Sequence, residues 1–278
     1  MKQLFDNVSA GCSKLATRTY STSFSLGIHC LSKTIHAPIY AIYGFVRFAD
    51  EIVDSFHDFN KKELFYEFRE ETWRAIGRGI SMNPILNSFQ DVVNKYKIDH
   101  DLIATFLRSM EIDLERTAHS GETYDEYIVG SAEVVGLMCL KVFTGDDDNL
   151  YTSLVPAARK LGAAFQKVNF LRDIKADYEH LGRVYFPGVA FGSFSEHDKK
   201  RIEDDIENDF REAFEGIKKL PGNARFGVYV AYMYYRTLFN KIRSVSPSRI
   251  REQRVRISNH RKIGLLVTSY FRHSFSIL

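Results

Sequence analysis

The chain has 278 residues, of which 45% are hydrophobic, 26% charged and 14% aromatic, and its net charge is +3. This hydrophobic fraction excludes general disorder, and the small net charge gives no reason to expect a nucleic-acid partner. Three widely spaced cysteines predict neither a disulfide framework nor a zinc site. The N-terminal residues are too polar for a signal peptide, and no apolar run reaches the roughly 18 residues that cross a bilayer. We therefore expect a cytoplasmic protein.

Apolar residues recur at helical rather than strand spacing along most of the chain. The segment 38–54, PIYAIYGFVRFADEIVD, is apolar almost throughout. In LIATFLRSMEIDL, every fourth position from the start is apolar, and these positions form one helical stripe: Leu102, Phe106, Met110 and Leu114. No strand hairpin, internal repeat or low-complexity linker is evident. The pattern predicts an all-α, single-domain bundle of roughly ten helices over residues 1–278, with an interior.

Local signals indicate where several helices begin and where connections lie. Asn83 precedes Pro84, the preferred order of an N-cap and a first helical residue. Capping boxes are predicted at 123–126 and, more weakly, at 195–198. Two polar segments, 145–148 and 220–223, are typical of connections.

Two of the expected helices carry a polar stripe that ends in two aspartates one turn apart. At about 100° per residue, the first stripe falls within an arc of about 60° and the second within about 80°. The first stripe comprises Tyr43, Arg47, Asp50 and Asp54, and the second comprises Gln166, Asn169, Asp173 and Asp177.

Paired carboxylates at this spacing destabilise a helix, so something must offset their repulsion. Solvent would do so on an exposed face, which is the usual situation for one such pair. Here, however, both pairs lie in apolar sequence, which favours carboxylates facing each other across a cavity with divalent cations between them. Oxygen ligands without nearby His or Cys favour Mg²⁺, which commonly also binds substrate phosphate.

Residues suited to an anionic ligand accompany the two stripes. Ser21 and Ser23 are small hydroxyl donors, and Arg47 and Arg172 could each bind phosphate oxygens in a bidentate manner. Salt bridges from these arginines to neighbouring aspartates are an equally good interpretation. Asn169 and Gln166 could complete a metal site or orient a phosphate, or could simply be buried amides: these alternatives stay open.

Three segments resemble the phytoene synthase and squalene synthase family of head-to-head prenyl transferases. They are YSTSF, RFADEIVD and NFLRDIKADYEHLGRVYFP, and the segments MEIDL and YIVGSAEVVG between them fit the family in order and spacing. The resemblance covers about residues 9–260 and is closest to the bacterial 15-cis-phytoene synthases. It implies an isoprenoid-synthase helical bundle around a central cavity, with Mg²⁺ (or Mn²⁺) and prenyl diphosphates bound between two aspartate-rich motifs.

Carried over by position, the resemblance assigns roles to particular residues. Metal ligands would be Asp50, Asp54, Asn169, Asp173 and Asp177. Substrate binding would fall to Ser21, Ser23, Arg47, Gln166, Asn169 and Arg172, and the catalytic group would be Tyr43, Arg47, Tyr127, Arg172 and Tyr185. The family's C-terminal basic phosphate contact could be Arg251, Arg254 or Arg256. The second motif has Lys175-Ala176 where relatives often have Gly-Glu, but its flanking aspartates are intact.

The implied reaction joins two geranylgeranyl diphosphates through a cyclopropylcarbinyl diphosphate to give phytoene, without NADPH. The alternative within the family is a C30 dehydrosqualene or squalene synthase acting on farnesyl diphosphate. A catalytically silent family member and a terpene cyclase are weaker alternatives, because both acidic pairs and the Arg-Asp-x-x-x-Asp form of the second motif are present. The apolar tail 263–278 could contact a membrane peripherally during product release, but packing on its own domain is favoured.

Overall fold

The computed structural model describes residues 1–115, 121–182, 184–258, 264–266 and 268–269, and within these ranges it contains helices and no strand. The fold is therefore all-α, as the periodicity predicts. Its helices are α1 (Lys2–Tyr20), α2 (Thr22–His29), α3 (Lys33–Asp54), α4 (Lys61–Arg78), α5 (Pro84–Tyr96), α6 (His100–Glu115), α7 (Gly121–Ile128), α8 (Val134–Thr144), α9 (Asp148–Leu181), α10 (Glu196–Lys219), α11 (Arg225–Arg243) and α12 (Pro247–Glu252).

The predicted helix starts are correct in two of three cases. The Asn83 side chain accepts hydrogen bonds from the backbone of Ile85 (3.0 Å) and Leu86 (3.4 Å), which confirms it as the N-cap of α5. Ser195 and Asp198 form the full capping box of α10. The third prediction was wrong in position, because α7 begins two residues before Thr123, whose side chain lies outside the described part.

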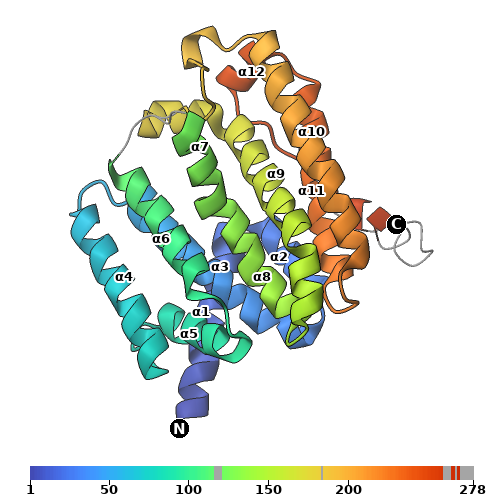
Figure 1. Ribbon diagram of the computed structural model, residues 1–278. Helices are drawn as coiled ribbons and strands as arrows, with labels where there is room; N and C mark the ends of the chain where they lie inside the picture. The colour runs from blue at the N-terminus through green and yellow to red at the C-terminus, as the bar shows by residue number, and fades with distance from the viewer. Residues whose placement is uncertain (116–120, 183, 259–263, 267, 270–278) are drawn as a thin grey trace.

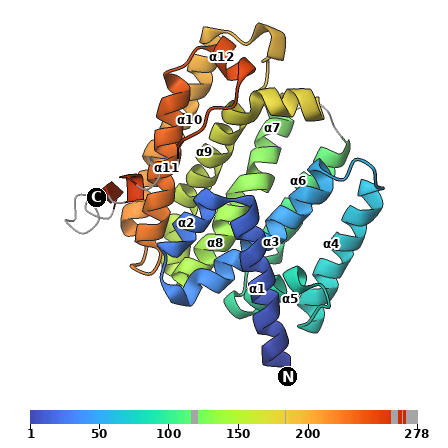
Figure 2. The same ribbon diagram turned by 180° about the vertical axis from the view of Figure 1, so that it is seen from behind.

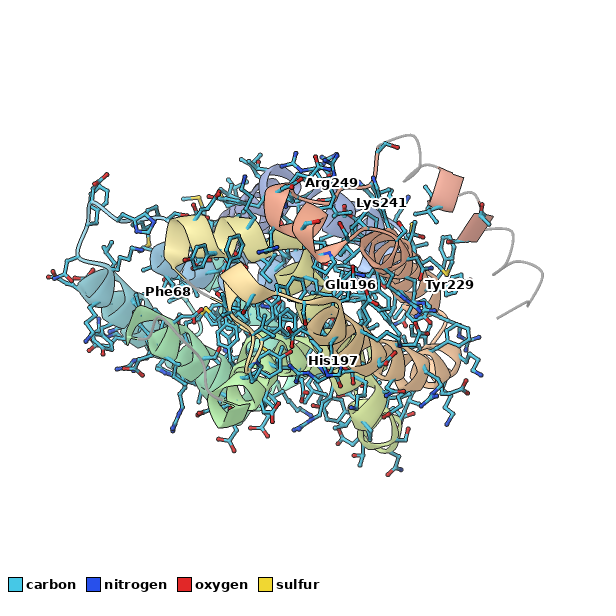
Figure 3. All side chains as sticks on the ribbon, turned by 90° about the horizontal axis from the view of Figure 1, so that it is seen from above. Phe68, Glu196, His197, Tyr229, Lys241 and Arg249 are labelled. Atoms are coloured by element: carbon cyan, nitrogen blue, oxygen red, sulfur yellow. The ribbon has the colours of Figure 1, made fainter. Side chains whose placement is uncertain are left out.

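Helices α3 and α9 carry the two acidic stripes and share one neighbour, α8. Helix α3 packs on α1, α5 and α8, whereas α9 packs on α10, α8 and α11. Figures 1 and 2 show α4 to α6 on one side of the bundle and α9 to α11 on the other. Viewed from above, Phe68 of α4 and Tyr229 of α11 lie toward opposite ends of the molecule (Figure 3). In Figure 2 the C-terminal ends of α3 and α9 both lie toward the upper edge.

Aromatic packing fixes α3 in the core. Phe45 is fully buried, and its ring stacks on Phe89 of α5 with centroids 3.9 Å apart. Phe68 of α4 and Phe106 of α6 complete the cluster at 5.8 and 5.3 Å. Burial of each side chain of this size stabilises the fold by about 2–3 kcal/mol. This packing holds one face of α3 in the core, and the polar stripe lies on another face of the helix.

A turn of π-helix, Val129–Glu133, separates α7 from α8 in the segment YIVGSAEVVG. Two glycines allow close approach there. A Cβ at Gly130 would lie 2.5 Å from the Cβ of Ser109, and one at Gly162 would lie 2.6 Å from the carbonyl oxygen of Ala132. The π-turn, which sequence periodicity missed, is thus wedged between α6 and α9, and such turns often occur at functional sites.

One described stretch, Tyr124–Thr144, has the length and composition of a membrane span, contrary to the sequence expectation. Half of its most apolar window is buried inside the protein, and it packs within the bundle beside α9, so core burial accounts for its apolar character. Of the tail 263–278 the structure describes 264–266 and 268–269, and its predicted packing stays a prediction.

Candidate active site

The first acidic stripe occupies the last three turns of α3 and is organised around Arg47. Its guanidinium donates to the carboxylates of Asp50 and Glu51, so the salt-bridge interpretation of this arginine is confirmed. Glu51 was not among the predicted site residues, because it falls off the stripe by one position. Arg47 thereby links the polar stripe to the adjacent face of the helix.

Negative charge accumulates beside Asp50. Burial raises the pKa of Asp50 to about 7, and the negative charge of Asp54 adds to this rise. Asp113 and Glu51 raise the pKa further, whereas the positive charge of Arg47 lowers it. The Asp50 side chain retains 35% of its accessible surface, so it is enclosed by protein yet open on one side. A cation bound beside these carboxylates would favour their charged forms.

The second acidic stripe lies on α9, where two arginines engage Asp173. Arg172 donates to both carboxylate oxygens at 3.0 and 2.5 Å. Arg254 approaches the same oxygens at 2.6 and 3.1 Å, from a segment 81 residues further along the chain. Asp173 is only 18% exposed, so these are partly desolvated, charge-assisted contacts rather than surface pairs.

The structure separates the three C-terminal arginines that the sequence left open. Among the described contacts of these three residues, the one that reaches an acidic stripe is the pair of Arg254 with Asp173. Arg251 donates to the carbonyl oxygens of Phe191 and Gly192 at 3.2 and 2.8 Å, a structural role at the base of α12. The carbonyl of Arg256 accepts from Lys241 at 2.6 Å.

One tyrosine accompanies each stripe, Tyr43 on α3 itself and Tyr235 on α11 beside Asn169 of α9. Burial raises the pKa of Tyr43 on α3 to about 12, contact with Ser21 partly opposes the rise, and Tyr235 of α11 lies close enough to affect it. The Tyr235 hydroxyl contacts the side-chain oxygen of Asn169 at 3.3 Å, and its ring stacks on Phe165 at 3.9 Å. Tyr235 was missed from the sequence, since nothing local distinguishes it among the tyrosines of YMYYRTLF.

A stack of aromatic rings forms the wall beside the first acidic pair. Phe170 and Tyr185 are parallel with centroids 4.0 Å apart, and Tyr127 stacks on Tyr185 at 5.3 Å. The Tyr127 hydroxyl donates to the buried carboxylate of Asp113 at 2.7 Å. Burial, followed by the charge of Asp113, raises the pKa of Tyr127 well above its ordinary value. The structure therefore brings Tyr127 and Tyr185 together, and adds Phe170 and Asp113, which sequence reasoning did not select.

The remaining predicted binders have less defined surroundings. Ser21 is the N-cap of α2, and its hydroxyl accepts from the backbone of Phe24 at 3.2 Å while also contacting Tyr43. Ser23 and Gln166 are partly buried on α2 and α9, and no hydrogen bond described here joins them to the network.

In the part of the chain that the structure describes, no three His, Cys, Asp or Glu residues gather as a ready-made metal site. The physical reason on the α9 side is plain, because Asp173 is engaged by two guanidiniums. The donor chemistry nevertheless suits a hard cation, since Asp50 and Asp54 repel each other and offer oxygen ligands only.

Comparisons with known proteins agree with this geometry. The family model for squalene/phytoene synthase matches residues 17–193. A phytoene synthase of Arthrospira platensis is 26% identical over 81% of this chain and 81% of its own length. Phytoene synthase 1 of Arabidopsis thaliana is 26% identical over 90% of this chain, which spans 63% of that relative's length.

Solved structures share the fold over nearly the whole chain. A dehydrosqualene synthase crystal structure aligns with a TM-score of 0.81 at 21% identity, covering 97% of this chain and 98% of that one. A squalene synthase from Alicyclobacillus acidocaldarius aligns with a TM-score of 0.74 at 18% identity, covering 86% and 94%. This chain has the all-α isoprenoid synthase fold and belongs to the squalene/phytoene synthase family.

Proposed function

We propose that this protein is a prenyl transferase that condenses two prenyl diphosphates head to head, with geranylgeranyl diphosphate as substrate and phytoene as product. One observation carries the proposal: two carboxylate–arginine sets lie on separate helices, Arg47 with Asp50 on α3 and Arg172 with Asp173 on α9. The relatives named phytoene synthases support the choice of product.

Mg²⁺, or Mn²⁺ in its place, is the expected cofactor. Its ligands would be the two acidic pairs together with Asn169. When bound, the cation neutralises the negative charge that develops on the oxygens of a leaving diphosphate. The raised pKa of Asp50 supports this choice, since a buried and crowded carboxylate is stabilised by a divalent cation. NADPH is not expected for a product formed by proton loss.

The arginines would bind the diphosphate oxygens. Arg47, Arg172 and Arg254 each contact an aspartate. Phosphate oxygens resemble carboxylate oxygens in charge and geometry, so they would replace the aspartates at these guanidiniums or bind beside them. Ser21, Ser23 and Gln166 would add neutral hydrogen bonds around the same group.

The aromatic wall would shield the reactive cation that forms when diphosphate departs. The stacked faces of Tyr127, Tyr185 and Phe170 exclude water, and aromatic faces attract a cation. Tyr127 donates a hydrogen bond to Asp113, which fixes the orientation of its ring, and its raised pKa keeps the phenol protonated.

The test is a substrate comparison in the presence of Mg²⁺ and the absence of NADPH, with products identified by chromatography. We expect geranylgeranyl diphosphate to give phytoene. A strong preference for farnesyl diphosphate and a C30 product would instead assign the chain to the dehydrosqualene or squalene synthases. No pyrophosphate release from either substrate would indicate a catalytically silent member of the family.

Site variants test the residue roles separately. Asp50→Asn and Asp173→Asn are each expected to lower turnover at least 100-fold while leaving the helical circular dichroism unchanged. Asp146→Asn is the matched control, because Asp146 is fully exposed in the connection before α9, at the opposite end of that helix from its acidic stripe. Near-normal turnover in either site variant would contradict the metal-site assignment.

A further inference from the structure

Helix α1 presents its large aliphatic side chains to solvent. Leu4 and Leu15 are each 67% exposed, and Val8 is 55% exposed. At about 100° per residue, these three positions fall within an arc of about 40° and form one apolar stripe along the outside of the helix. Single exposed apolar residues are ordinary on a protein surface, but a row of them on one helix face indicates an interaction surface.

The opposite side of α1 packs on the bundle through small side chains. Ser9, Ser13 and Thr17 are fully buried there. The hydroxyls of Ser9 and Thr17 donate to backbone carbonyl oxygens one turn earlier, at 2.9 and 2.8 Å. Helix α3 approaches so closely that a Cβ at Gly44 would lie 3.2 Å from the hydroxyl oxygen of Ser13. The small residues of α1 therefore make its core contact, and the aliphatic stripe lies on the other side.

Positive charge lies beside the apolar stripe. Lys14 and Arg18 are exposed on a neighbouring arc of α1, one turn apart, a spacing at which like charges repel. His29, at the end of α2, lies close enough to both for their charges to affect it. Burial lowers the pKa of His29, and Arg18, His36 and Lys14 lower it further, so the charges that act on this group are all positive. An anion beside these side chains would be stabilised.

The charges of Lys14 and Arg18 are not balanced by carboxylates. In the part of the chain that the structure describes, neither side chain forms an ion pair. The one acidic residue in the sequence of α1 is Asp6, about 180° around the helix from the stripe. Asp6 pairs with Lys2 at 2.9 Å and accepts from the side chain of Asn87 at 3.1 Å. Its charge is therefore engaged on the α5 side of the helix.

A bilayer surface fits these features better than a second copy of the chain does. A standard protein interface buries about 800 Å² on each partner, far more than three aliphatic side chains cover. A helix that lies in a membrane interface needs only an apolar face flanked by Lys or Arg. The N-terminal end of α1 also extends beyond the rest of the bundle in Figures 1 and 2, where a flat surface can reach it.

From these observations we propose that the outer face of α1 docks on an anionic lipid bilayer. Leu4, Val8 and Leu15 insert among the lipid headgroups, and Lys14 and Arg18 bind headgroup phosphates. The contact is peripheral, because α1 stays packed on α3 and α5 by its opposite side. This surface is separate from the acidic stripes and from the tail 263–278, and the inference does not depend on the proposed function.

The experiment is flotation of the full-length protein with lipid vesicles. One set of vesicles contains phosphatidylcholine alone, and the other contains equal parts of phosphatidylcholine and phosphatidylglycerol. We expect binding to the anionic vesicles to be at least about tenfold tighter, because cationic side chains are attracted to an anionic surface. High salt should weaken this binding by screening the charges. Equal binding to both kinds of vesicle, or binding to neither, would overturn the proposal.

Apolar variants locate the contact. The double variant Leu4→Gln/Leu15→Gln should weaken binding to anionic vesicles at least about tenfold, because less apolar surface is removed from water. It should fold normally, since both side chains are exposed. Met82→Gln is the matched control, because Met82 is 82% exposed in the connection between α4 and α5, and this variant should bind as the unaltered protein does. Unchanged binding in the double variant would assign any membrane contact to another surface and refute the inference.

A charge variant and the oligomeric state complete the test. Arg18→Gln should weaken binding to anionic vesicles about fivefold, whereas Arg78→Gln, at an exposed position at the end of α4, should leave it unchanged. Equal effects of the two would contradict a specific role of the cations beside the stripe. Light scattering examines the competing occupant. A dimer that dissociates in the double variant, together with absent vesicle binding, would show that the stripe is an interface between copies of the chain.

Discussion

Replacing Asp50 by Asn should stabilise the metal-free protein at alkaline pH. Burial and the nearby charge of Asp54 raise the folded-state pKa of Asp50 from 3.8 to about 7. Between these values the folded state binds the proton more readily than the unfolded chain, so the free energy of unfolding falls as pH rises through this window. Asparagine carries no charge and avoids this loss, while Arg47 keeps Glu51 as a partner.

The magnitude follows from the shift and from solvent screening. A shift of about 3 units corresponds to about 4 kcal/mol for a group without solvent contact. The Asp50 side chain is 35% exposed, so we discount this to about 1–2 kcal/mol at pH 8. In a chain of this size that is a rise in Tm of about 2–6 °C.

The assay is thermal unfolding followed by circular dichroism, with chelator present, at pH 4.5 and pH 8. We expect the Tm of the Asn variant to be higher than that of the unaltered protein at pH 8. At pH 4.5 the two Tm values should differ little. Asp146→Asn, at a fully exposed position, should show no such pH-dependent gain. A variant that is less stable at both pH values would refute the reasoning, since it would mean that the Arg47 pair outweighs burial and repulsion.

Three further predictions concern packing, substrate binding and a buried ion pair. Gly130→Ala should cost about 1–3 kcal/mol of stability, because its Cβ would collide with a side chain of α6. Gly77 lies within α4 and a Cβ there meets open space, so Gly77→Ala should instead stabilise the protein by about 0.5–1 kcal/mol. If chemical denaturation gave the same change in unfolding free energy for both variants, the close packing at Gly130 would be contradicted. Arg254→Gln should raise KM for the prenyl diphosphate about tenfold. Arg249 is half exposed on α12, and Arg249→Gln should leave KM unchanged. An unchanged KM in Arg254→Gln would show that Arg254 does not belong to the site. Lys167→Met should destabilise the protein by about 3 kcal/mol, because the buried carboxylate of Asp209 on α10 would keep only Lys160 of these two lysine partners. An unchanged denaturation midpoint would show that the Lys167–Asp209 pair is dispensable for stability.

Much of the fold was accessible from the sequence, because its signals are local. Helical periodicity, the Asn83 cap and the Ser195 capping box each depend on residues within four positions of one another. The acidic stripes on α3 and α9 are equally local, since a helix places residues three or four apart on one face. The π-turn Val129–Glu133 was not accessible, because close packing against neighbouring helices, rather than periodicity, accommodates it.

What the sequence determined by itself was the all-α architecture and the two rows of carboxylates, each with its own arginine. Only the tertiary structure decided which distant side chains reach the second row, since that depends on contacts between residues far apart in the chain. Arg254 reaches Asp173 across 81 positions, and Tyr235 reaches Asn169 across 66.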